Sequence, residues 1–434
     1  MDATAIFDIG KTNKKFIVFD KGYTSIHEEQ VTITEIKDDD GDPVDDLKAI
    51  EDWMYDVLER ALARKEFEIS KLNFSTYGAT LVNLGENGKP VTPMYNYLKP
   101  YPSDLLEKFL EEFGGHESFC LSTSSPLFGM LNSGLQLYWL KNNKPLLFEK
   151  IVCSLHLPQY LSYLFTGKMF GEFTSVGCHS GLWDFANNNY HDWTHKSGIF
   201  PILPEIKRTG MSIHSHWKQK PLDVGLGIHD TSANLVPYLK QEKEPFMLLS
   251  TGTWSLVLNP FNDEPLTYDD LQNDCLNFLK YDGNPVKVAR LFLGNEYQLQ
   301  VEEMSKFFNK SSDYHQKVKF DTRIFNKLKK DAKIFSLKSI DLPDINKEGF
   351  TDLRMFESFE IAYHQLMIEL MEIQLDRINL AMGKGKVSKL FVDGGFVENG
   401  VFMSLLKINL PGIEIVPGDQ IAGSARGAAM MMRS

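Results

Sequence analysis

The chain opens with Ala3-Thr-Ala-Ile-Phe-Asp8-Ile-Gly10-Lys11-Thr12-Asn-Lys-Lys-Phe16-Ile-Val-Phe19, two apolar runs joined by a polar tip. Short apolar runs bounded by turn residues are typical of buried strands. The stretch therefore predicts a β-hairpin that carries an aspartate and a glycine close to its tip.

The same pattern recurs in the second half of the chain. Phe246-Met-Leu-Leu249 and Trp254-Ser-Leu-Val-Leu258 flank the tip Ser250-Thr-Gly-Thr253. One such unit in each half of a 434-residue chain indicates an internally duplicated α/β protein with two domains of roughly 200 residues each. We place the domains at residues 1–240 and 241–434 and expect a cleft between them.

Other segments give weaker expectations. Residues 46–65 and 356–382 have the three-and-four spacing of apolar residues that predicts amphipathic helices. Val31–Ile36 is predicted as a third strand, and the polar, lysine-rich residues 304–345 as a helical insertion. Residues 171–203 are rich in Gly, Asn, His and Trp and are predicted to be an irregular functional segment.

Composition excludes several classes of function. The net charge is −12 and no large cluster of Lys and Arg is present, which argues against nucleic acid as a partner. The four cysteines form no C-x-x-C pair, so we expect buried thiols in a reducing cytoplasm. No apolar run approaches the roughly 18 residues of a membrane span, and no signal peptide is expected. We therefore predict a cytoplasmic protein that uses neither a membrane nor nucleic acid.

Two glycine-bearing tips have the composition of phosphate-binding turns. Asp8 ends a strand and could hold a metal ion, while Gly10, Lys11 and Thr12 could contact phosphate oxygens. Gly252 and Thr253 offer a similar glycine and hydroxyl pair. Taken singly, each of these motifs is more often only a turn.

Two further motifs follow predicted strands. Asp393-Gly394-Gly395 with Asn399 would let a flat ligand lie on the backbone, although a strand–helix turn explains the glycines equally well. Gly225-Leu-Gly-Ile-His-Asp230 ends in a carboxylate that could accept a hydroxyl proton in phosphoryl transfer. A helix N-cap is the alternative interpretation of Asp230.

Together and in this order, the motifs Asp-x-Gly-x-Thr, Gly-x-x-Asp, Gly-Thr and Gly-Gly-x-x-x-Asn resemble those of the FGGY carbohydrate kinases, which have the actin-like/hexokinase fold. The segment Thr174-Ser175 with Gly181-Leu-Trp-Asp184 is similar to the central segment of that family. His229-Asp230-Thr231 and Ser250-Thr-Gly-Thr-Trp-Ser255 most resemble the rhamnulokinase branch.

The resemblance implies a two-domain kinase that uses ATP and Mg²⁺. By position it implies that Asp230 is the catalytic base and also lies at the substrate and the metal, and that Asp8 lies close to Mg²⁺. The phosphate and adenosine contacts would come from Gly10, Lys11, Thr12, Gly252, Thr253, Gly394, Gly395 and Asn399. The sugar would lie in the N-terminal domain near Tyr77, Gly78, Tyr97 and the 95–101 loop, and the nucleotide in the C-terminal domain.

The substrate stays open at this point. The loop Tyr95-Asn-Tyr-Leu-Lys-Pro-Tyr101 has neither the Asp nor the Arg that many family members carry there. L-rhamnulose, L-fuculose and xylulose are candidates, as are polyols such as glycerol or erythritol. A carboxylate kinase of the acetate kinase type and a non-catalytic nucleotide sensor are the alternatives on the same fold. A homodimer is also left open.

Overall fold

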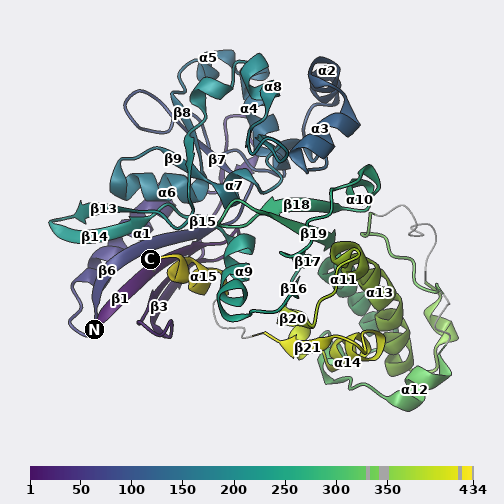
Figure 1. Ribbon diagram of the computed structural model, residues 1–434. Helices are drawn as coiled ribbons and strands as arrows, with labels where there is room; N and C mark the ends of the chain where they lie inside the picture. The colour runs from purple at the N-terminus through teal and green to yellow at the C-terminus, as the bar shows by residue number, and fades with distance from the viewer. Residues whose placement is uncertain (329–332, 342–350, 419–422, 433–434) are drawn as a thin grey trace. The chain divides into compact units, whose positions relative to one another are not determined.

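The structure is a computed structural model, which describes residues 1–328, 333–341, 351–418 and 423–432. It contains two compact units (Figure 1). The first unit comprises residues 1–241, 277–285 and 421–434, and the second comprises residues 242–276 and 286–420. The last helix of the chain therefore belongs to the first unit, because its side chains complete the core of that unit.

The first unit is built on a seven-stranded sheet with the order β13-β14-β6-β1-β2-β3, in which β15 also pairs with β6. Strands β1, β6, β14 and β15 run parallel, whereas β2, β3 and β13 are antiparallel to their neighbours. The strands are β1 (Asp2–Ile9), β2 (Lys14–Phe19), β3 (Ser25–Val31), β6 (Glu68–Thr76), β13 (Ser212–Trp217), β14 (Lys220–Gly225) and β15 (Ile228–His229).

Helices cover both faces of this sheet. Alternate residues of β1 and β2 point to opposite faces, as strand geometry requires: Phe7 and Phe16 pack on one side, Ile6 and Ile17 on the other. The Phe7 side is covered by α1 (Leu47–Leu62) and α6 (Leu157–Thr166), and the Ile6 side by α9 (Asp230–Gln241) and α15 (Gly423–Met431). The remaining helices are α2 (Ser103–Phe113), α3 (His116–Thr123), α4 (Ser133–Asn143), α5 (Pro145–Phe148), α7 (Phe173–Val176) and α8 (Asp192–Lys196).

Short strand pairs stabilise the segments outside the central sheet. They are β4 (Ile36–Lys37) with β5 (Pro43–Val44), β7 (Leu81–Leu84) with β8 (Cys153–His156), β9 (Phe170–Glu172) with β12 (Glu205–Lys207), and β10 (Trp183–Asp184) with β11 (Asn189–Tyr190). The predicted irregular segment 171–203 is thus a series of short elements, and most of its apolar residues are buried.

The sheet of the second unit has the same strand order as part of the sheet of the first. Its six-stranded sheet has the order β18-β19-β17-β16-β20-β21, in which β16 and β17 form the predicted second hairpin and β20 and β21 run parallel to β16. The order β19-β17-β16-β20-β21 matches β3-β2-β1-β6-β14 in the first unit, so the predicted internal duplication is confirmed. The strands are β16 (Phe246–Thr251), β17 (Ser255–Asn259), β18 (Cys275–Leu279), β19 (Pro285–Leu291), β20 (Lys389–Gly394) and β21 (Glu414–Pro417).

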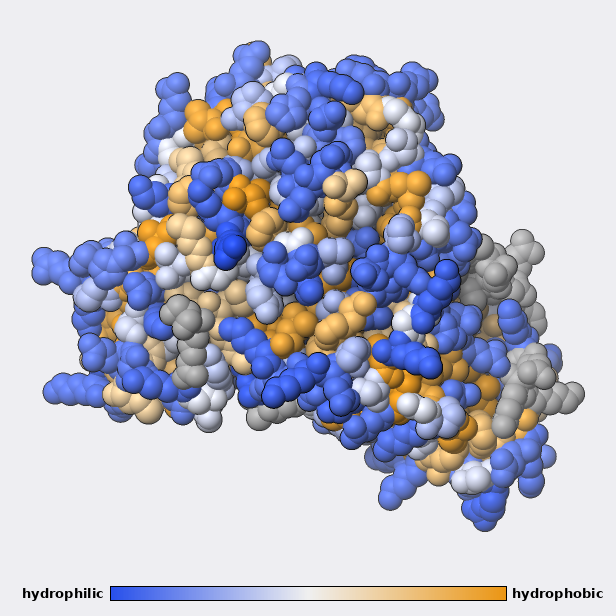
Figure 2. Space-filling model, viewed as in Figure 1, coloured by the Kyte–Doolittle hydropathy of each residue, from blue (hydrophilic) through white to orange (hydrophobic). Residues whose placement is uncertain are grey.

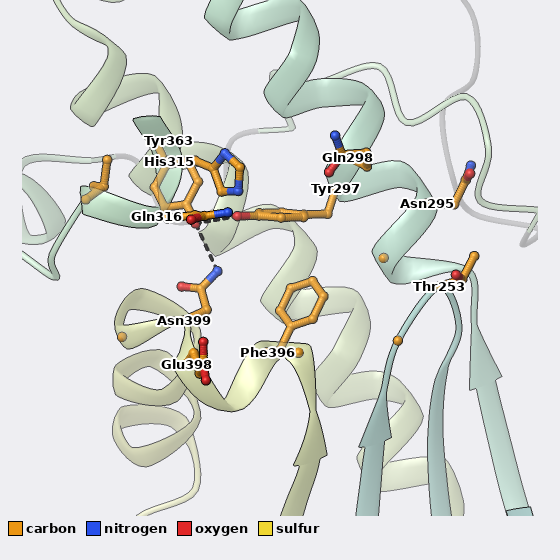
Figure 3. Close-up of a pocket in the computed structure, with 15 residues that line it drawn as sticks. Thr253, Asn295, Tyr297, Gln298, His315, Gln316, Tyr363, Phe396, Glu398 and Asn399 are labelled. Carbon is orange, nitrogen blue, oxygen red and sulfur yellow. Dashed lines mark hydrogen bonds between the residues drawn. The ribbon is translucent and has the colours of Figure 1, made fainter. Parts of the chain in front are cut away.

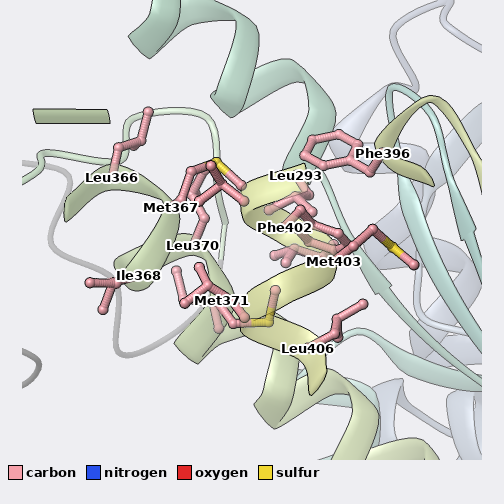
Figure 4. Close-up of a cluster of buried hydrophobic side chains, with 14 of the residues drawn as sticks. Leu293, Leu366, Met367, Ile368, Leu370, Met371, Phe396, Phe402, Met403 and Leu406 are labelled. Atoms are coloured by element: carbon pink, nitrogen blue, oxygen red, sulfur yellow. The ribbon is translucent and has the colours of Figure 1, made fainter. Parts of the chain in front are cut away.

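The core of the second unit lies where α13 and α14 pack on this sheet. Figure 4 shows Leu370, Met371 and Phe402 among the buried side chains of the two helices. The predicted helix 356–382 corresponds to α13, which begins after the N-cap Ser358. The helices are α10 (Tyr268–Gln272), α11 (Leu293–Phe307), α12 (Thr322–Lys327), α13 (Phe359–Met382) and α14 (Gly400–Asn409).

Two predicted elements are wrong. The third strand is Ser25–Val31 rather than Val31–Ile36, because it is an edge strand whose half-exposed polar residues hide the apolar pattern. The described residues of 304–345 do not form a helical insertion: α11 ends at Phe307, and a 3₁₀ turn at Tyr314–Lys317 and the short α12 follow it. Residues 329–332 and 342–345 lie outside the described residues.

Figure 2 shows a mostly hydrophilic face on which apolar residues form small separate areas. Among the residues described, no helix is long and apolar enough to cross a membrane.

Candidate functional site

The first unit brings two carboxylates to one end of its sheet. Asp8 lies near the end of β1 and pairs with Ser75 of β6, and Ile228 of β15 pairs with the same Ser75 from the other side. Asp230 follows β15 directly and is the first residue of α9. Parallel strands end at the same edge of a sheet, which is where ligands of α/β proteins usually bind. The structure thus places the two predicted acidic residues together.

Asp230 keeps one oxygen free. Its Oδ1 accepts hydrogen bonds from the backbone N–H (2.6 Å) and the hydroxyl (3.2 Å) of Thr231 and lies 3.3 Å from Nε2 of His229. Its Oδ2 accepts no hydrogen bond from the residues that the structure describes. Burial raises the pKa of Asp230 to about 6. A carboxylate with a raised pKa and a free oxygen is suited to accept a proton.

Asp8 is held by the last helix of the chain. The hydroxyl of Ser424 on α15 donates to its two carboxylate oxygens at 3.1 and 3.0 Å. Burial, and after it the negative charge of Asp230, raises the pKa of Asp8 to about 6. Two neighbouring carboxylates repel each other when both are ionised, and a bound cation would relieve that repulsion.

Mg²⁺ fits this pair of residues by the chemistry of its donors. Mg²⁺ prefers carboxylate and water oxygens, and within the described ranges no lysine or arginine forms an ion pair with Asp8 or Asp230. The predicted metal residues would therefore hold the ion without first losing a cationic partner. The group of Asp38, Asp39 and Asp40 differs, because Lys99 and Lys144 already pair with these carboxylates.

A buried network fixes the strand that carries Asp230. Glu172, fully buried, accepts hydrogen bonds from the backbone N–H groups of Thr174 (2.8 Å) and Ser175 (2.7 Å) and from the hydroxyl of Thr209 (2.6 Å). The Thr174 hydroxyl also accepts the backbone N–H of His229 at 3.0 Å. This role of Glu172 could not be predicted from the sequence, since Thr209 and His229 lie far from it along the chain.

The predicted sugar residues are packed around His229 and the hairpin tip. A side chain at Gly78 would approach the imidazole of His229 to 3.1 Å, so a glycine keeps that space for the ring. Tyr77 is buried, and its hydroxyl donates to Oδ2 of Asp45 at 2.7 Å. The ring of Tyr97 meets the ring of Tyr77 edge-on, with centroids 6.1 Å apart.

The hairpin tip differs from a simple phosphate turn. The N–H of Gly10 donates to the carbonyl of Asn13 at 3.0 Å, and Thr12 is exposed. Lys11, however, points its ammonium at Asp45 (2.7 Å) and Glu35 (2.8 Å). Asp45 and its second partner Lys14 were missed in the sequence because they carry no motif.

The second unit contains a pocket of about 700 Å³ (Figure 3). Of the five positions predicted for this half, Gly252, Thr253, Gly395 and Asn399 line the pocket, and Gly394 lies beside it at the end of β20. The other lining residues are Gly294, Asn295, Tyr297, Gln298, His315, Gln316, Val318, Tyr363, Phe396, Glu398 and Gly400. Aromatic walls and amide groups around a glycine floor suit a flat, polar-edged ligand such as a nucleobase.

Asn399 connects the pocket to the start of α14. Its Oδ1 accepts the N–H groups of Val401 (3.2 Å) and Phe402 (3.1 Å), which caps the helix, and its Nδ2 donates to the hydroxyl of Tyr363 at 2.9 Å. The hydroxyls of Tyr363 and Tyr297 lie 2.9 Å apart (Figure 3). One face of the pocket is therefore a continuous hydrogen-bonded chain.

The two glycines at the end of β20 have different functions. Gly394 has φ +88°, and a side chain there would collide with the carbonyl oxygen of Thr251. A side chain at Gly395 would meet no atom within 4 Å, so this position opens on the pocket. The sequence alone could not separate the structural glycine from the one that leaves space for a ligand.

The chain belongs to the FGGY family of carbohydrate kinases, because the sequence model of the family's N-terminal domain matches residues 3–229. The chain is 30% identical over 194 residues to a rhamnulokinase of Halalkalibacterium halodurans, an alignment that covers 43% of this chain and 41% of that protein. The chain thus spans about two fifths of the length of the curated relatives that it matches. The predicted likeness to the rhamnulokinase branch is confirmed.

Solved structures show the same fold along almost the whole chain. A carbohydrate kinase from Novosphingobium aromaticivorans superposes with a TM-score of 0.79 at 20% identity over 99% of this chain and 93% of that chain. A ligand-bound xylulose kinase from Lactobacillus acidophilus gives a TM-score of 0.80 at 14% identity over 100% of this chain and 89% of that chain. The predicted α/β fold with two actin-like domains is confirmed.

Proposed function

We propose that this chain is an ATP-dependent sugar kinase that phosphorylates a hydroxyl of a ketose. The observation that carries the proposal is the Asp8–Asp230 pair, two carboxylates without a cationic side-chain partner in the described part of the chain, placed at the end of the central strands. Membership of the FGGY family supports phosphoryl transfer to a carbohydrate. The rhamnulokinase relatives favour L-rhamnulose, or a related ketose such as L-fuculose or xylulose, over polyols such as glycerol or erythritol.

In the proposed reaction Asp230 is the base. The O–H bond of the acceptor breaks and its proton passes to Oδ2 of Asp230, while the oxygen forms a bond to the terminal phosphorus of ATP and the bond to ADP breaks. Asp8 and Asp230 would hold Mg²⁺, which would offset the charge of the phosphates. In this proposal Asp230 has to be ionised before the acceptor binds.

The two units would divide the substrates. The first unit would bind the sugar near Tyr77, Gly78 and Tyr97. The second would bind ATP in the pocket that Gly252, Thr253, Gly395 and Asn399 line, with Gly394 shaping its floor; Gly10 and Thr12 would contact the phosphates. The cytoplasm, where ATP is available and where four buried free thiols are stable, is the proposed location.

The test is acceptor-dependent release of ADP from Mg²⁺ and ATP. The panel contains L-rhamnulose, L-fuculose, D-xylulose, glycerol, erythritol, D-gluconate and acetate. The proposal expects the highest kcat/KM with one of the three ketoses. Activity confined to acetate would indicate a carboxylate kinase. Nucleotide binding with no turnover on any acceptor would indicate a sensor, and either result would overturn the proposal.

A further inference from the structure

Lys11 lies on the hairpin tip but faces the predicted sugar residues. Its Nζ is 2.7 Å from Oδ2 of Asp45 and 2.8 Å from Oε1 of Glu35, and it lies 5.9 Å from the centroid of the Tyr77 ring. A lysine that serves a phosphate would be expected to keep its ammonium free for that anion. The ion pairs therefore argue that Lys11 has another function.

Asp45 fixes the position of this lysine. The Asp45 side chain is 3% exposed, and both oxygens are used: Oδ1 accepts from Lys14 (2.8 Å), and Oδ2 accepts from Lys11 and from the Tyr77 hydroxyl (2.7 Å each). Burial raises the pKa of Asp45 and these hydrogen bonds lower it, with a lowered pKa as the net result. The carboxylate is thus ionised and holds Lys11 in one place.

Three polar groups around Tyr97 keep bonding capacity for a ligand. An ammonium has three N–H donors, and Lys11 uses two of them in its bonds to Glu35 and Asp45. The third has no acceptor among the described residues, and 26% of the Lys11 side chain is exposed to solvent. The Tyr97 hydroxyl likewise has no hydrogen-bond partner in the described part of the chain, and Oδ2 of Asp230 is free. The Tyr97 ring lies 6.1 Å from the Tyr77 ring, and the Lys11 ammonium lies 5.9 Å from the same Tyr77 ring, so Lys11 and Tyr97 both lie beside Tyr77.

The charges of this cluster cancel. The ammonium groups of Lys11 and Lys14 are balanced by the carboxylates of Asp45 and Glu35, and Asp8 and Asp230 add the negative charge that would hold Mg²⁺. An acceptor with a carboxylate would bring a further negative charge close to Asp8, Asp230 and a Lys11 ammonium that is already paired with two carboxylates. The cluster therefore favours an uncharged acceptor over an aldonate.

We propose that Lys11 is a specificity-determining residue for the acceptor: its free N–H and the Tyr97 hydroxyl bind oxygens of an uncharged ketose or polyol, and Asp45 and Lys14 hold it in place. This inference rests on the proposed kinase function. It assigns Lys11 to the acceptor rather than to the phosphates of ATP, and it makes a D-gluconate-like anion a poor substrate.

Steady-state kinetics separate the two assignments of Lys11. KM for the best acceptor of the panel and KM for ATP are measured for the wild type, Lys11→Met and Lys11→Gln. Loss of a hydrogen bond from a charged donor is expected to raise the acceptor KM of Lys11→Met by about ten- to a hundredfold, with KM for ATP within about twofold of the wild type. Lys11→Gln keeps a neutral donor and should recover part of the loss.

Lys144→Met is the matched control, because Lys144 is also a half-buried lysine that pairs with two carboxylates of the same unit, Asp39 and Asp40. It should leave both KM values unchanged. Melting temperatures of all variants show whether the fold is intact; if Lys11→Met is unfolded, the comparison is made with Lys11→Gln.

Two results would overturn the inference while the kinase function stands. One is a wild-type kinase whose Lys11 variants raise KM for ATP and leave the acceptor KM unchanged. The other is a wild type with a higher kcat/KM for D-gluconate than for every ketose and polyol. A wild type that releases no ADP with any acceptor is a different result, and it would overturn the proposed function together with the inference.

Discussion

Nε2 of His229 lies 3.3 Å from Oδ1 of Asp230, the oxygen that also accepts the hydrogen bonds of Thr231. Burial lowers the pKa of His229 to about 4, so the imidazole is neutral at physiological pH. The ring packs beside the carboxylate and adds no positive charge, while its Nε2 also contacts Sγ of Cys178 at 3.4 Å. Oδ2 of Asp230 is thereby left for the acceptor.

Replacement of His229 should therefore slow turnover without affecting the nucleotide. His229→Asn removes the ring atoms that pack against Asp230, so the carboxylate can shift. A small displacement of a catalytic group can cost about 10²-fold in rate, and kcat is expected to fall by about that factor. His229→Gln places an amide nitrogen near the lost Nε2 and should recover part of kcat. The exposed His216→Ala is the control. Equal kcat values for His229→Asn and the wild type would show that the position of Asp230 does not depend on the neighbouring imidazole.

The ionised carboxylate of Asp8 should lower the free energy of unfolding at neutral pH when Mg²⁺ is removed. Its folded-state pKa of about 6 lies above the usual value of 3.8. Between these values the folded chain binds a proton that the unfolded chain does not, so the free energy of unfolding falls as the pH rises through this window. In EDTA, Asp8→Asn should melt roughly 2–4 °C above the wild type at pH 7.5 and at the same temperature at pH 4. A variant that melts lower at pH 7.5 would contradict this.

Glu172 should be essential for the fold around the site. Its carboxylate accepts from Thr174, Ser175 and Thr209, and loss of hydrogen bonds to a buried charged group costs about 1.5–3 kcal/mol for each bond. We expect Glu172→Ala to lower the free energy of unfolding by at least about 3 kcal/mol, measured by urea denaturation. The exposed Glu149→Ala is the control. Similar stability of the two variants would show that Glu172 is not needed to hold the segment.

The pocket of the second unit can be filled without disturbing the backbone. A side chain at Gly395 meets no atom within 4 Å, and the same is true at Gly412 in a turn away from the pocket. Gly395→Leu should keep the wild-type melting temperature. Its Kd for ATP, measured by calorimetry, should be at least about tenfold higher than that of the wild type. Gly412→Leu should bind normally. Unchanged affinity in Gly395→Leu would place the nucleotide elsewhere.

The sequence predicted the parts of the fold that have local signals. The two hairpins, α1 and α13 were predictable because their apolar residues follow strand or helix periods over many positions. Strand β3 was misplaced, since an edge strand with Glu28, Glu29 and Gln30 has no such pattern. The order of the motifs pointed to Asp8, Asp230 and the glycines. Asp8 and Asp230 lie at one end of the first unit's sheet, and Gly252 and Gly395 line one pocket of the second unit.

The supporting residues could not be predicted from the sequence. Asp45 lies 34 positions from Lys11, and Glu172 meets Thr209 across 37 positions; neither pair belongs to a motif. Buried networks of this kind depend on how strands and loops are brought together, which a single sequence does not reveal. Lys11 was assigned to a phosphate turn because it follows Gly10 at the hairpin tip. Its ion pairs with Asp45 and Glu35 favour a function at the acceptor instead.

Turnover by Asp230→Asn tests the central claim most directly. Asparagine keeps the size of the side chain and removes the oxygen that would accept the proton, so ADP release in the presence of the best acceptor should fall by at least about 10³-fold. Affinity for ATP, measured by calorimetry on the same preparation, should stay within about twofold of the wild type. Acceptor-dependent ADP release at the wild-type rate in Asp230→Asn would contradict the assignment of Asp230 as the base.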